Sequence, residues 1–385
     1  GGEGAEHSDY LPEFAHLGSD PTIRTLEVKG RRRRWATDTL YSFLLRDRAG
    51  RAVFSSSGGL ARIAPMMNSS SPHVRRVAVL ITQMYASPKG GGMTKVITAS
   101  GAARELFQQS LDCASWGVGI LQAGGASADD GAGAVQVGPI VMGAALSAWA
   151  CAASLASEHR VRPDDVAQVT ALVARTRVTP GVGPATTSLA GCLATISLDL
   201  RGSAVVMNQC RGRGAGPRHA LQAVLAPASE QADAGSRGSG MVRCVAAGAV
   251  AALARHSLAS PEPGASWSSE RHLFGPHRYL LAEGHMHRAV LRANRAPCSE
   301  ERWGRLLHQA TAEVVMYLSL VPYLPFDEGD VEALLDMMGA EHPHETPTSS
   351  HMAAAAWGLA RADTRTGNRG RLAACGGLNA LSTLV

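Results

Sequence analysis

A short helical pattern with a glycine pair at its centre occurs at both ends of this chain. At the C-terminal end, an alanine-rich stretch at 351–360 precedes a polar segment, the pair Gly376–Gly377, and then three leucines at helical spacing. Alanine lets helices approach closely, and a glycine pair tolerates the positive φ angle of a sharp corner. The spaced leucines give one apolar stripe. The pattern therefore predicts helices that pack closely around a tight corner.

The same order of elements occurs near the N-terminal end. An apolar segment at 51–54 precedes the pair Gly58–Gly59, and a second apolar segment follows at 60–67. A turn at 68–71 then leads to a stripe of apolar residues at 74–81. Ser71 and Pro72 suit the residue before a helix and its first position. We therefore expect three successive helices in this stretch.

The spacing of the corners predicts the length of the repeat. Gly101 lies between apolar segments as Gly58 does, and it follows Gly58 by 43 residues. This spacing lies within the roughly 40–47 residues of HEAT and armadillo units. Alanines near the centres of the predicted third helices mark the later repeats. They are Ala78, Ala145, Ala190, Ala247, Ala310 and Ala354.

These repeats resemble the armadillo family. The C-terminal stretch has the Ala- and Trp-bearing third helix, the Asn-Arg-x-x-Leu first helix at 368–372, the glycine corner and the leucine-bearing second helix of that family. The resemblance implies an all-α, armadillo-type α-solenoid, a right-handed superhelix of roughly six or seven degenerate three-helix repeats. It also implies an extended groove that binds protein partners.

The predicted organisation is an irregular N-terminal segment at 1–34 followed by a repeat array at 35–385. Trp35 to Leu45, with Leu40, Phe43 and Leu44 on one face, is expected to form the third helix of an incomplete first repeat. The last repeat lacks a third helix, so we expect the chain to be part of a longer one. Loop insertions that lack the apolar content to order alone are predicted near 122–137, 226–240 and 259–270.

Composition favours helical packing over a cofactor pocket. Hydrophobic residues make up 45% of the chain but aromatic residues only 5%, so we predict no cofactor. The net charge of +5 suits an acidic partner, and the few aromatic residues are not interleaved with basic ones, so no nucleic-acid partner is expected. Seven scattered cysteines without a CxxC motif predict reduced thiols in the cytoplasm. The most apolar stretch, Val141 to Ala156, contains Ser147 and Ser154 and predicts a buried helix, so no membrane partner is expected.

Histidines are the best candidates for chemistry, and they do not form a convincing metal site. His272, His277, His285 and His287 lie close together in sequence, but no cysteine stands nearby at ligand spacing. We expect exposed loop histidines there and at His342 and His344, and no metal. The chain also lacks a dinucleotide fingerprint, a phosphate-binding loop and a nucleophile elbow. The sequence therefore predicts a protein that is not an enzyme.

Arginines are the candidate partner-binding residues. Nuclear-import adaptors of the armadillo family use a Trp and an Asn four residues apart, whereas Trp357 is followed by Arg361, which disfavours that role. The adhesion and signalling branch binds acidic ligands in a basic groove. Four arginines are candidates for such a groove or, equally, for ordinary solvated surface: Arg75, Arg76, Arg175 and Arg243.

Degenerate armadillo proteins with loop insertions also serve as structural parts of the ciliary axoneme. We therefore expect a non-catalytic scaffold in a large microtubule-associated, cytoskeletal assembly such as the axoneme of a cilium or flagellum, with several protein partners. The alternatives are a soluble adaptor that binds an extended acidic peptide, and a regulatory solenoid attached to an enzyme outside this chain. The run Arg31–Arg34 fits a localisation signal, a dock for an acidic tail, or a solvated segment.

Overall fold

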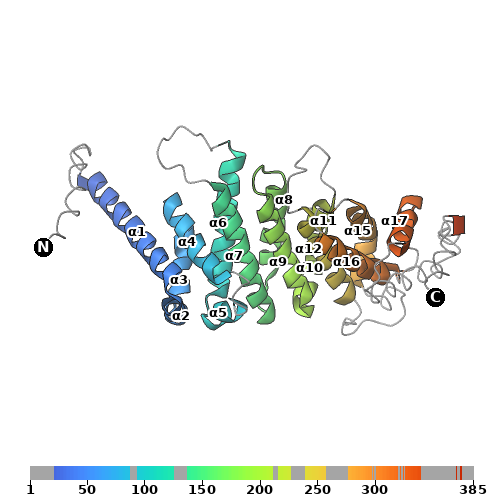
Figure 1. Ribbon diagram of the computed structural model, residues 1–385, viewed down its shortest axis with the longest axis horizontal. Helices are drawn as coiled ribbons and strands as arrows, with labels where there is room; N and C mark the ends of the chain where they lie inside the picture. The colour runs from blue at the N-terminus through green and yellow to red at the C-terminus, as the bar shows by residue number, and fades with distance from the viewer. Residues whose placement is uncertain are drawn as a thin grey trace.

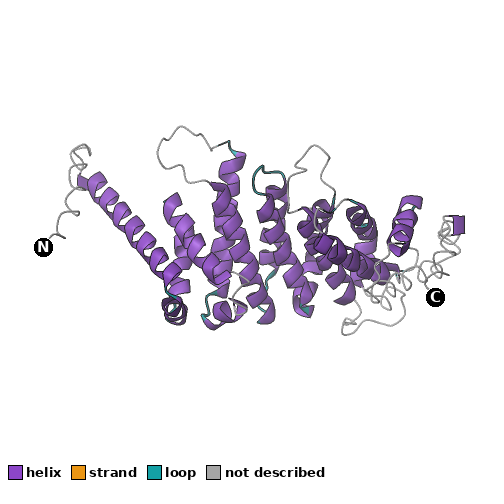
Figure 2. Ribbon diagram, in the orientation of Figure 1, coloured by secondary structure: helices purple, strands orange, loops and turns teal. Residues whose placement is uncertain are grey.

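The chain forms an elongated row of helices (Figure 1), and every regular element among the described residues is helical (Figure 2). The predicted all-α class is therefore confirmed. The structure, a computed structural model, describes residues 21–86, 93–124, 137–210, 216–226, 239–256, 276–296, 298, 301–319, 321, 324, 326–339, 370 and 373–374.

The helices follow one another along the long axis of the molecule, so each packs on segments close to it in sequence (Figure 1). In chain order they are α1 (Pro21–Arg46), α2 (Arg48–Ser56), α3 (Gly59–Ile63), the 3-10 helix η2 (Ala64–Asn68), α4 (Pro72–Ala86), α5 (Met93–Ala99), α6 (Ala103–Gln122), α7 (Val137–Ser157), α8 (Pro163–Arg177), α9 (Gly183–Leu198), α10 (Leu200–Cys210), α11 (Pro217–Leu225), α12 (Ser239–His256), α14 (Pro276–Glu283), α15 (Met286–Arg295), α16 (Glu301–Ser319) and α17 (Glu328–Gly339).

Two layers of helices run along the row. In the first layer, which we call the central layer, α4 packs on α7, α7 on α9, α9 on α12, and α12 on α16. In the outer layer, η2 packs on α6, α6 on α8, α8 on α11, α11 on α15, and α15 on α17. The short helices α5, α10 and α14 pack against the central layer. Five of the six marker alanines lie in the five helices of the central layer, and Ala354 lies outside the described residues.

Small residues let the central layer pack closely. A Cβ atom added at Gly191 on α9 would lie 2.5 Å from Cε2 of Trp149 on α7. A Cβ atom added at Gly143 on α7 would likewise overlap Val79 of α4. These two crossings therefore require glycine, because protein interiors are packed too densely to move a facing ring or a branched side chain at no cost.

Tight left-handed corners separate three pairs of consecutive helices, α2 from α3, α5 from α6, and α14 from α15. Gly58 has φ +77° and Gly101 has φ +67°, as the predicted corners require. His285, between α14 and α15, takes the same left-handed conformation with φ +52°. Histidine is one of the few residues enriched there. The sequence does not predict this corner, because histidine adopts the left-handed conformation far less often than glycine.

Two segments that were expected to be irregular are helical. Residues 21–34 belong to α1, so the predicted irregular N-terminal segment is wrong from Pro21 onward, and residues 1–20 lie outside the described part. Arginine is a good helix former and Pro21 suits the first helical position, which explains the longer helix. The histidine-bearing stretch at 276–295 forms α14 and α15. The predicted insertions at 122–137, 226–240 and 259–270 lie mostly or wholly outside the described residues.

The helix α7 has the length and apolar composition of a membrane span, as do α9 and α10 if that pair, bent by 117°, is counted together. Within α7, 72% of the most apolar window is buried in the molecule, because α4, α6 and α9 pack around it. The core helix of a soluble protein has the same length and composition. The burial of α7 agrees with the buried helix predicted for Val141 to Ala156.

Candidate interaction surface

Side-chain hydrogen bonds join neighbouring helices of the outer layer. On α6, Nη1 of Arg104 lies 2.7 and 2.6 Å from the two carboxylate oxygens of Asp165 on α8. Gln108 of α6 donates to Gln168 of α8 at 2.9 Å. The Asp165 carboxylate also accepts from the backbone N–H of Arg162 at 2.7 Å, where α8 begins. These polar groups therefore hold the row together.

Two of the four candidate arginines, Arg75 and Arg243, are buried, and they too join neighbouring helices. The Nε of Arg75 donates to the Ser69 carbonyl, and its guanidinium lies 4.0 Å from the centre of the Trp116 ring. Nη1 of Arg243 donates to the carbonyls of Ala293 at 2.7 Å and Ala296 at 3.1 Å, at the end of α15. Both side chains therefore stabilise contacts between helices.

The other two candidates differ in exposure. The half-buried Arg175 donates to the Ser115 hydroxyl at 2.9 Å, whereas Arg76 is exposed on α4. The four candidates lie on α4, α8 and α12, which α7 and α9 separate along the row (Figure 1). The structure does not bring them into one basic cluster.

The histidines do not form a metal centre in the described part of the chain. The ring of His287 is fully buried on α15, with its centroid 5.0 Å from that of Phe326. The expectation of an exposed loop histidine is therefore wrong at His287, although the neighbouring His285 is exposed. His272, His342 and His344 lie outside the described residues. Among the residues that are described, no group of three or more His, Cys, Asp or Glu could hold a metal ion.

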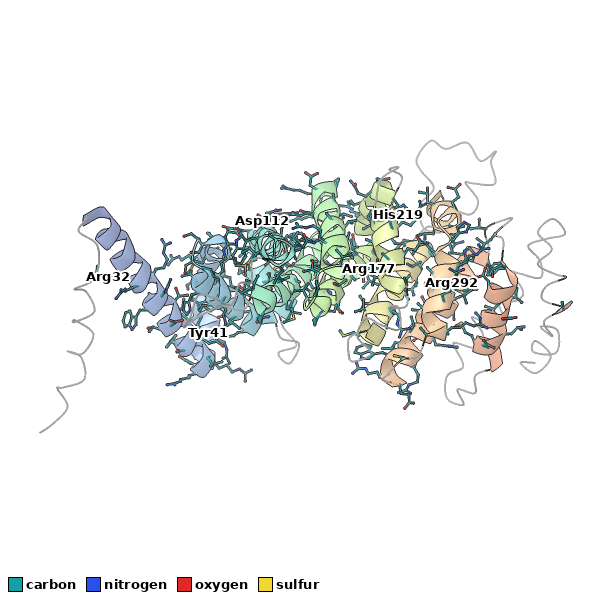
Figure 3. All side chains as sticks on the ribbon, turned by 90° about the horizontal axis from the view of Figure 1, so that it is seen from above. Arg32, Tyr41, Asp112, Arg177, His219 and Arg292 are labelled. Atoms are coloured by element: carbon teal, nitrogen blue, oxygen red, sulfur yellow. The ribbon has the colours of Figure 1, made fainter. Side chains whose placement is uncertain are left out.

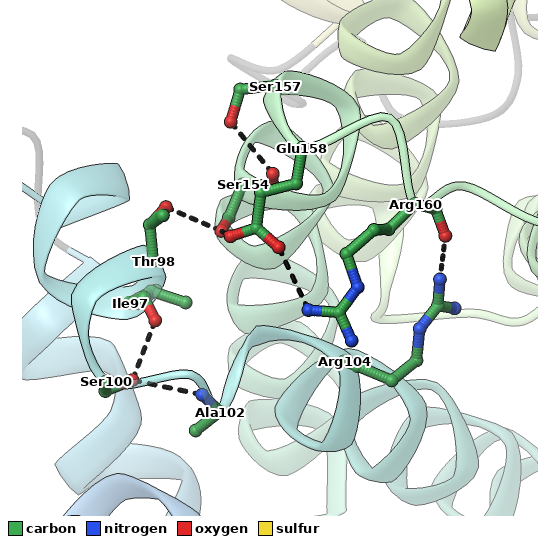
Figure 4. A network of polar contacts seen from close by, with 9 residues as sticks. All are labelled: Ile97, Thr98, Ser100, Ala102, Arg104, Ser154, Ser157, Glu158 and Arg160. Carbon is green, nitrogen blue, oxygen red and sulfur yellow. Dashed lines mark hydrogen bonds and ion pairs between the residues drawn. The ribbon is translucent and has the colours of Figure 1, made fainter.

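A polar network joins α5, α6 and the C-terminal end of α7 (Figure 4). The hydroxyls of Thr98 and Ser154 lie 2.7 Å apart, and Ser154 also donates to Glu158 at 3.3 Å. Arg160 donates to the same Glu158 carboxylate at 3.0 Å, and Arg104 donates to the Arg160 carbonyl. These hydrogen bonds therefore join the end of α7 to α5 and to the start of α6.

A His–Asp pair lies next to this network but does not extend it into a catalytic triad. Nδ1 of His159 lies 3.3 Å from Oδ1 of Asp199. The other oxygen of Asp199 accepts from the backbone N–H of Gly202 at 2.9 Å, at the start of α10. The Ser154 hydroxyl points to Thr98 and Glu158. The pair therefore stabilises the corner between α9 and α10.

Exposed apolar side chains gather at the N-terminal end of the row. Trp35 is 72% exposed, Phe43 53%, Leu45 55% and Val53 65%, and they are four of the eight large hydrophobic residues that are exposed in the described structure. Four exposed arginines immediately precede Trp35. We call this set the end surface: Arg31, Arg32, Arg33, Arg34, Trp35, Phe43, Leu45 and Val53.

Contacts with α4 fix the end surface at its base. Nε2 of His73 on α4 lies 2.9 and 3.0 Å from the carboxylate oxygens of Asp38 on α1. The Tyr85 hydroxyl donates to the carbonyl of Arg51 on α2 at 2.9 Å. In turn, Arg51 donates to the Leu44 carbonyl at 2.9 Å and so covers the end of α1. These contacts therefore hold the C-terminal half of α1 against α2 and α4.

The preceding part of α1 stands clear of the row. Residues 31–36 are all exposed, whereas Thr37 and Leu44 are buried. In Figure 3, Arg32 lies on the part of α1 that extends beyond the other helices, and Figure 1 shows the same helix leaning away from α4. The sequence places Leu40, Phe43 and Leu44 on one face of this helix. The structure buries Leu44 and exposes more than half of Phe43.

Comparison with known proteins does not assign a family. No protein-family model matches the chain, and no curated protein is significantly similar to it. Two crystal structures described as engineered proteins are among the similar structures. One is 12% identical with a TM-score of 0.42 and covers 85% of this chain and 97% of its own. The other is 13% identical with a TM-score of 0.33 and covers 95% and 92%. Similarity this low does not establish common ancestry or function.

Proposed function

We propose that this chain is a helical-repeat scaffold of the armadillo type that binds other proteins and catalyses no reaction. The observation that carries this proposal is the recurring order of helix contacts along the row. Each helix of the central layer packs on the next one, and each helix of the outer layer does the same. Solenoid repeats have this arrangement because each unit contacts only its neighbours, which leaves long surfaces for partners.

The corner residues support division of the row into three-helix units. Left-handed corners at Gly58, Gly101 and His285 each separate a first helix from a second one. The third helices of these units are α4, α7 and α16, which all lie in the central layer. The segment of α8 and α9 has only two described helices, so the array is a degenerate one.

The assembly that we propose is a large cytoskeletal one, and the ciliary axoneme is the first to test. A structural component is expected to bury broad apolar surfaces, and the exposed apolar side chains of the end surface fit such a partner. The alternative function, a soluble adaptor for an acidic peptide, is favoured by the exposed run Arg31–Arg34. Arg75 and Arg243 give this alternative little support, because a peptide could not contact side chains that are buried.

Extraction of the native protein from cells separates the two functions. A structural component should remain with a microtubule-containing fraction at high salt, because apolar interfaces are weakly screened. An adaptor held by arginines should be soluble and release an acidic partner as the ionic strength rises. Recovery of the protein as a soluble species without any partner at low salt would count against both.

A further inference from the structure

We propose that the end surface binds an acidic amphipathic helix of another protein, laid along α1. This inference rests on the proposed function, because it names the partner of a protein-binding scaffold.

The exposure of Trp35 is the first reason. Tryptophan is usually mostly buried, yet this side chain is 72% exposed. It lies about 80° around α1 from Phe43 in one direction and about 80° from Leu45 in the other. The three apolar side chains therefore lie on one broad face, with Trp35 between the other two around the axis and about 12 Å from Phe43 along it. Clustered exposed apolar groups with a polar rim are typical of protein interaction sites.

The packing of the row favours a helix as the partner. α1 uses one side to contact α4, where Thr37 and Leu44 are buried. Trp35 lies on the opposite side of the helix, where a further member of the row would pack. The described residues place no element there, and six consecutive residues, 31–36, are exposed. A helix from a partner would continue the packing that every other long helix of the row already has.

Charge favours an acidic partner. The sequence of α1 contains seven basic residues and two acidic ones, whereas the whole chain has a net charge of only +5. One of those two acidic residues, Asp38, already contacts His73. Arginine is enriched at interfaces and pairs well with carboxylates. Glutamate or aspartate on the rim of the partner helix would therefore face Arg31–Arg34, and its apolar stripe would cover Trp35.

A membrane or a nucleic acid fits the end surface less well. Four consecutive arginines at about 100° intervals encircle α1, so no side of this turn is free of charge for insertion into a bilayer. Nucleic acid would pair with the arginines and could stack a base on Trp35 or Phe43, but the aliphatic side chains of Leu45 and Val53 offer no ring for stacking. Aliphatic and aromatic groups together are typical of protein interfaces.

A second copy of this chain is also disfavoured. A symmetric pair of end surfaces would bring the two arginine runs together, which like-charge repulsion opposes. The acidic helix α17 is the other self-partner to consider. Its Asp330 and Asp336 lie 2.9 and 2.8 Å from the guanidinium groups of Arg288 and Arg295. These carboxylates are already engaged at the far end of the row.

Site-specific photo-crosslinking tests the proposal in an extract of the cells that make the protein. The full chain carries a benzophenone amino acid at position 35 or, as a control, at Val178, which is 70% exposed in the loop after α8. Mass spectrometry then identifies the crosslinked segment. We expect position 35 to capture an acidic, helix-forming segment of another protein that position 178 does not capture. Capture of a second copy, a lipid, a nucleic acid or a basic segment overturns the proposal, as does equal capture at both positions.

Binding of the captured segment, made as a synthetic peptide, gives the quantitative test. Trp35→Ser should weaken binding at least about tenfold, as truncation of a central aromatic anchor does. Changing Arg31–Arg34 to glutamine should weaken binding about tenfold at low salt and less at high salt. A matched variant loses the same charge at exposed arginines elsewhere and should bind within about twofold of the original chain. Its positions are Arg62, Arg177, Arg201 and Arg305.

The outcomes for this site and for the scaffold function are distinct. If the matched variant weakens binding as much as the Arg31–Arg34 variant, general charge explains the binding and the end surface is not the site. The extraction experiment does not depend on position 35. A protein that stays in the salt-resistant fraction while position 35 captures no acidic helix therefore remains a scaffold that uses another surface.

Discussion

The guanidinium of Arg104 on α6 contacts both carboxylate oxygens of Asp165 on α8, at 2.7 and 2.6 Å. The side chain of Asp165 is only 4% exposed and that of Arg104 18%. The same carboxylate accepts the backbone N–H of Arg162 and so caps the start of α8. One acidic group therefore joins two helices of the outer layer and fixes where the second one begins.

Asp165→Ala should lower the free energy of unfolding by about 3–5 kcal/mol, because it leaves the largely buried guanidinium of Arg104 without its carboxylate partner and removes a cap. Urea denaturation followed by circular dichroism measures the change. Asp164→Ala is the matched control, since Asp164 is exposed one position earlier, and it should change stability by less than about 0.5 kcal/mol. Equal losses in the two variants would show that the pair contributes nothing specific.

Glycine at the crossing of α7 and α9 should be irreplaceable, whereas glycine on α12 should not. Gly191→Ala places a Cβ atom against the Trp149 ring, so it should cost about 1–3 kcal/mol. Gly248→Ala meets nothing within 4 Å and should stabilise its helix by about 0.5–1 kcal/mol. Thermal melting of the two variants gives opposite shifts if this is correct.

A double variant checks the cause of that loss. In a Trp149→Leu background the ring is absent, so Gly191→Ala should cost less than it does alone. Trp149→Leu itself should be destabilising, because it removes the hydrogen bond of 2.8 Å to Thr195 and leaves space in the packing. An unchanged cost of Gly191→Ala in both backgrounds would mean that the backbone, and not the ring, causes the loss.

The sequence predicted the all-α class and the positions of several helices because those depend on local patterns. Gly58 and Gly101 signalled corners, and alanine-rich stretches signalled the closely packed helices of the central layer. The irregular segment expected at 1–34 is wrong from Pro21 onward, because an arginine-rich polar sequence can form a helix. His285 was missed as a corner because a residue type that tolerates φ +52° does not require it.

The candidate site was harder to predict because exposure depends on tertiary packing. The sequence predicts Arg75 and Arg243 as surface groups. Both side chains are instead buried, because they donate hydrogen bonds to carbonyls at the ends of neighbouring helices. Nothing local in the sequence marks those carbonyls. Periodicity places Phe43 on the same face as Leu40 and Leu44. Only the position of α4 shows that Leu44 fills the core and that Trp35 lies on the opposite side.

The cysteines of the central layer should be unreactive in the folded protein. Burial raises the pKa of Cys151 to about 12 and that of Cys192 well above its usual value. At pH 8 an alkylating reagent should therefore leave both thiols unmodified, whereas the half-buried Cys298 should react. Mass spectrometry before and after denaturation gives the readout. Rapid modification of Cys151 without unfolding would show that α7 is not enclosed as described.

The same thiols predict how stability changes at alkaline pH. In the unfolded chain a thiol has a pKa of about 8.5. Burial raises the pKa of both thiols above this value in the folded chain. The stability that this shift contributes is fully present below the unfolded pKa and is lost as the pH rises above it. Cys151→Ala with Cys192→Ala should therefore reduce the loss of stability between pH 8 and pH 10, roughly the window in which unfolded thiols ionise.

The corner between α9 and α10 should weaken in acid because of Asp199. Burial acts to raise the pKa of its carboxyl group, but hydrogen bonds from the Gly202 backbone and the His159 ring outweigh it and lower that pKa. The stabilisation is therefore present above the unfolded pKa of about 4 and is lost as the pH falls. Asp199→Ala should cost about 1 kcal/mol at pH 7, as the loss of a helix cap does, and less at pH 3, roughly one pH unit below that value.

Asparagine at this position separates the cap from the charge. Asp199→Asn keeps an oxygen that can accept from the Gly202 N–H, so it should retain most of the stability at neutral pH. It cannot titrate, so the difference in unfolding free energy between the original chain and this variant should shrink toward zero in acid. Denaturation at pH 7 and pH 3 measures both effects. If Asp199→Asn costs as much as Asp199→Ala at pH 7, the contact of 3.3 Å with His159, and not the cap, carries the stabilisation.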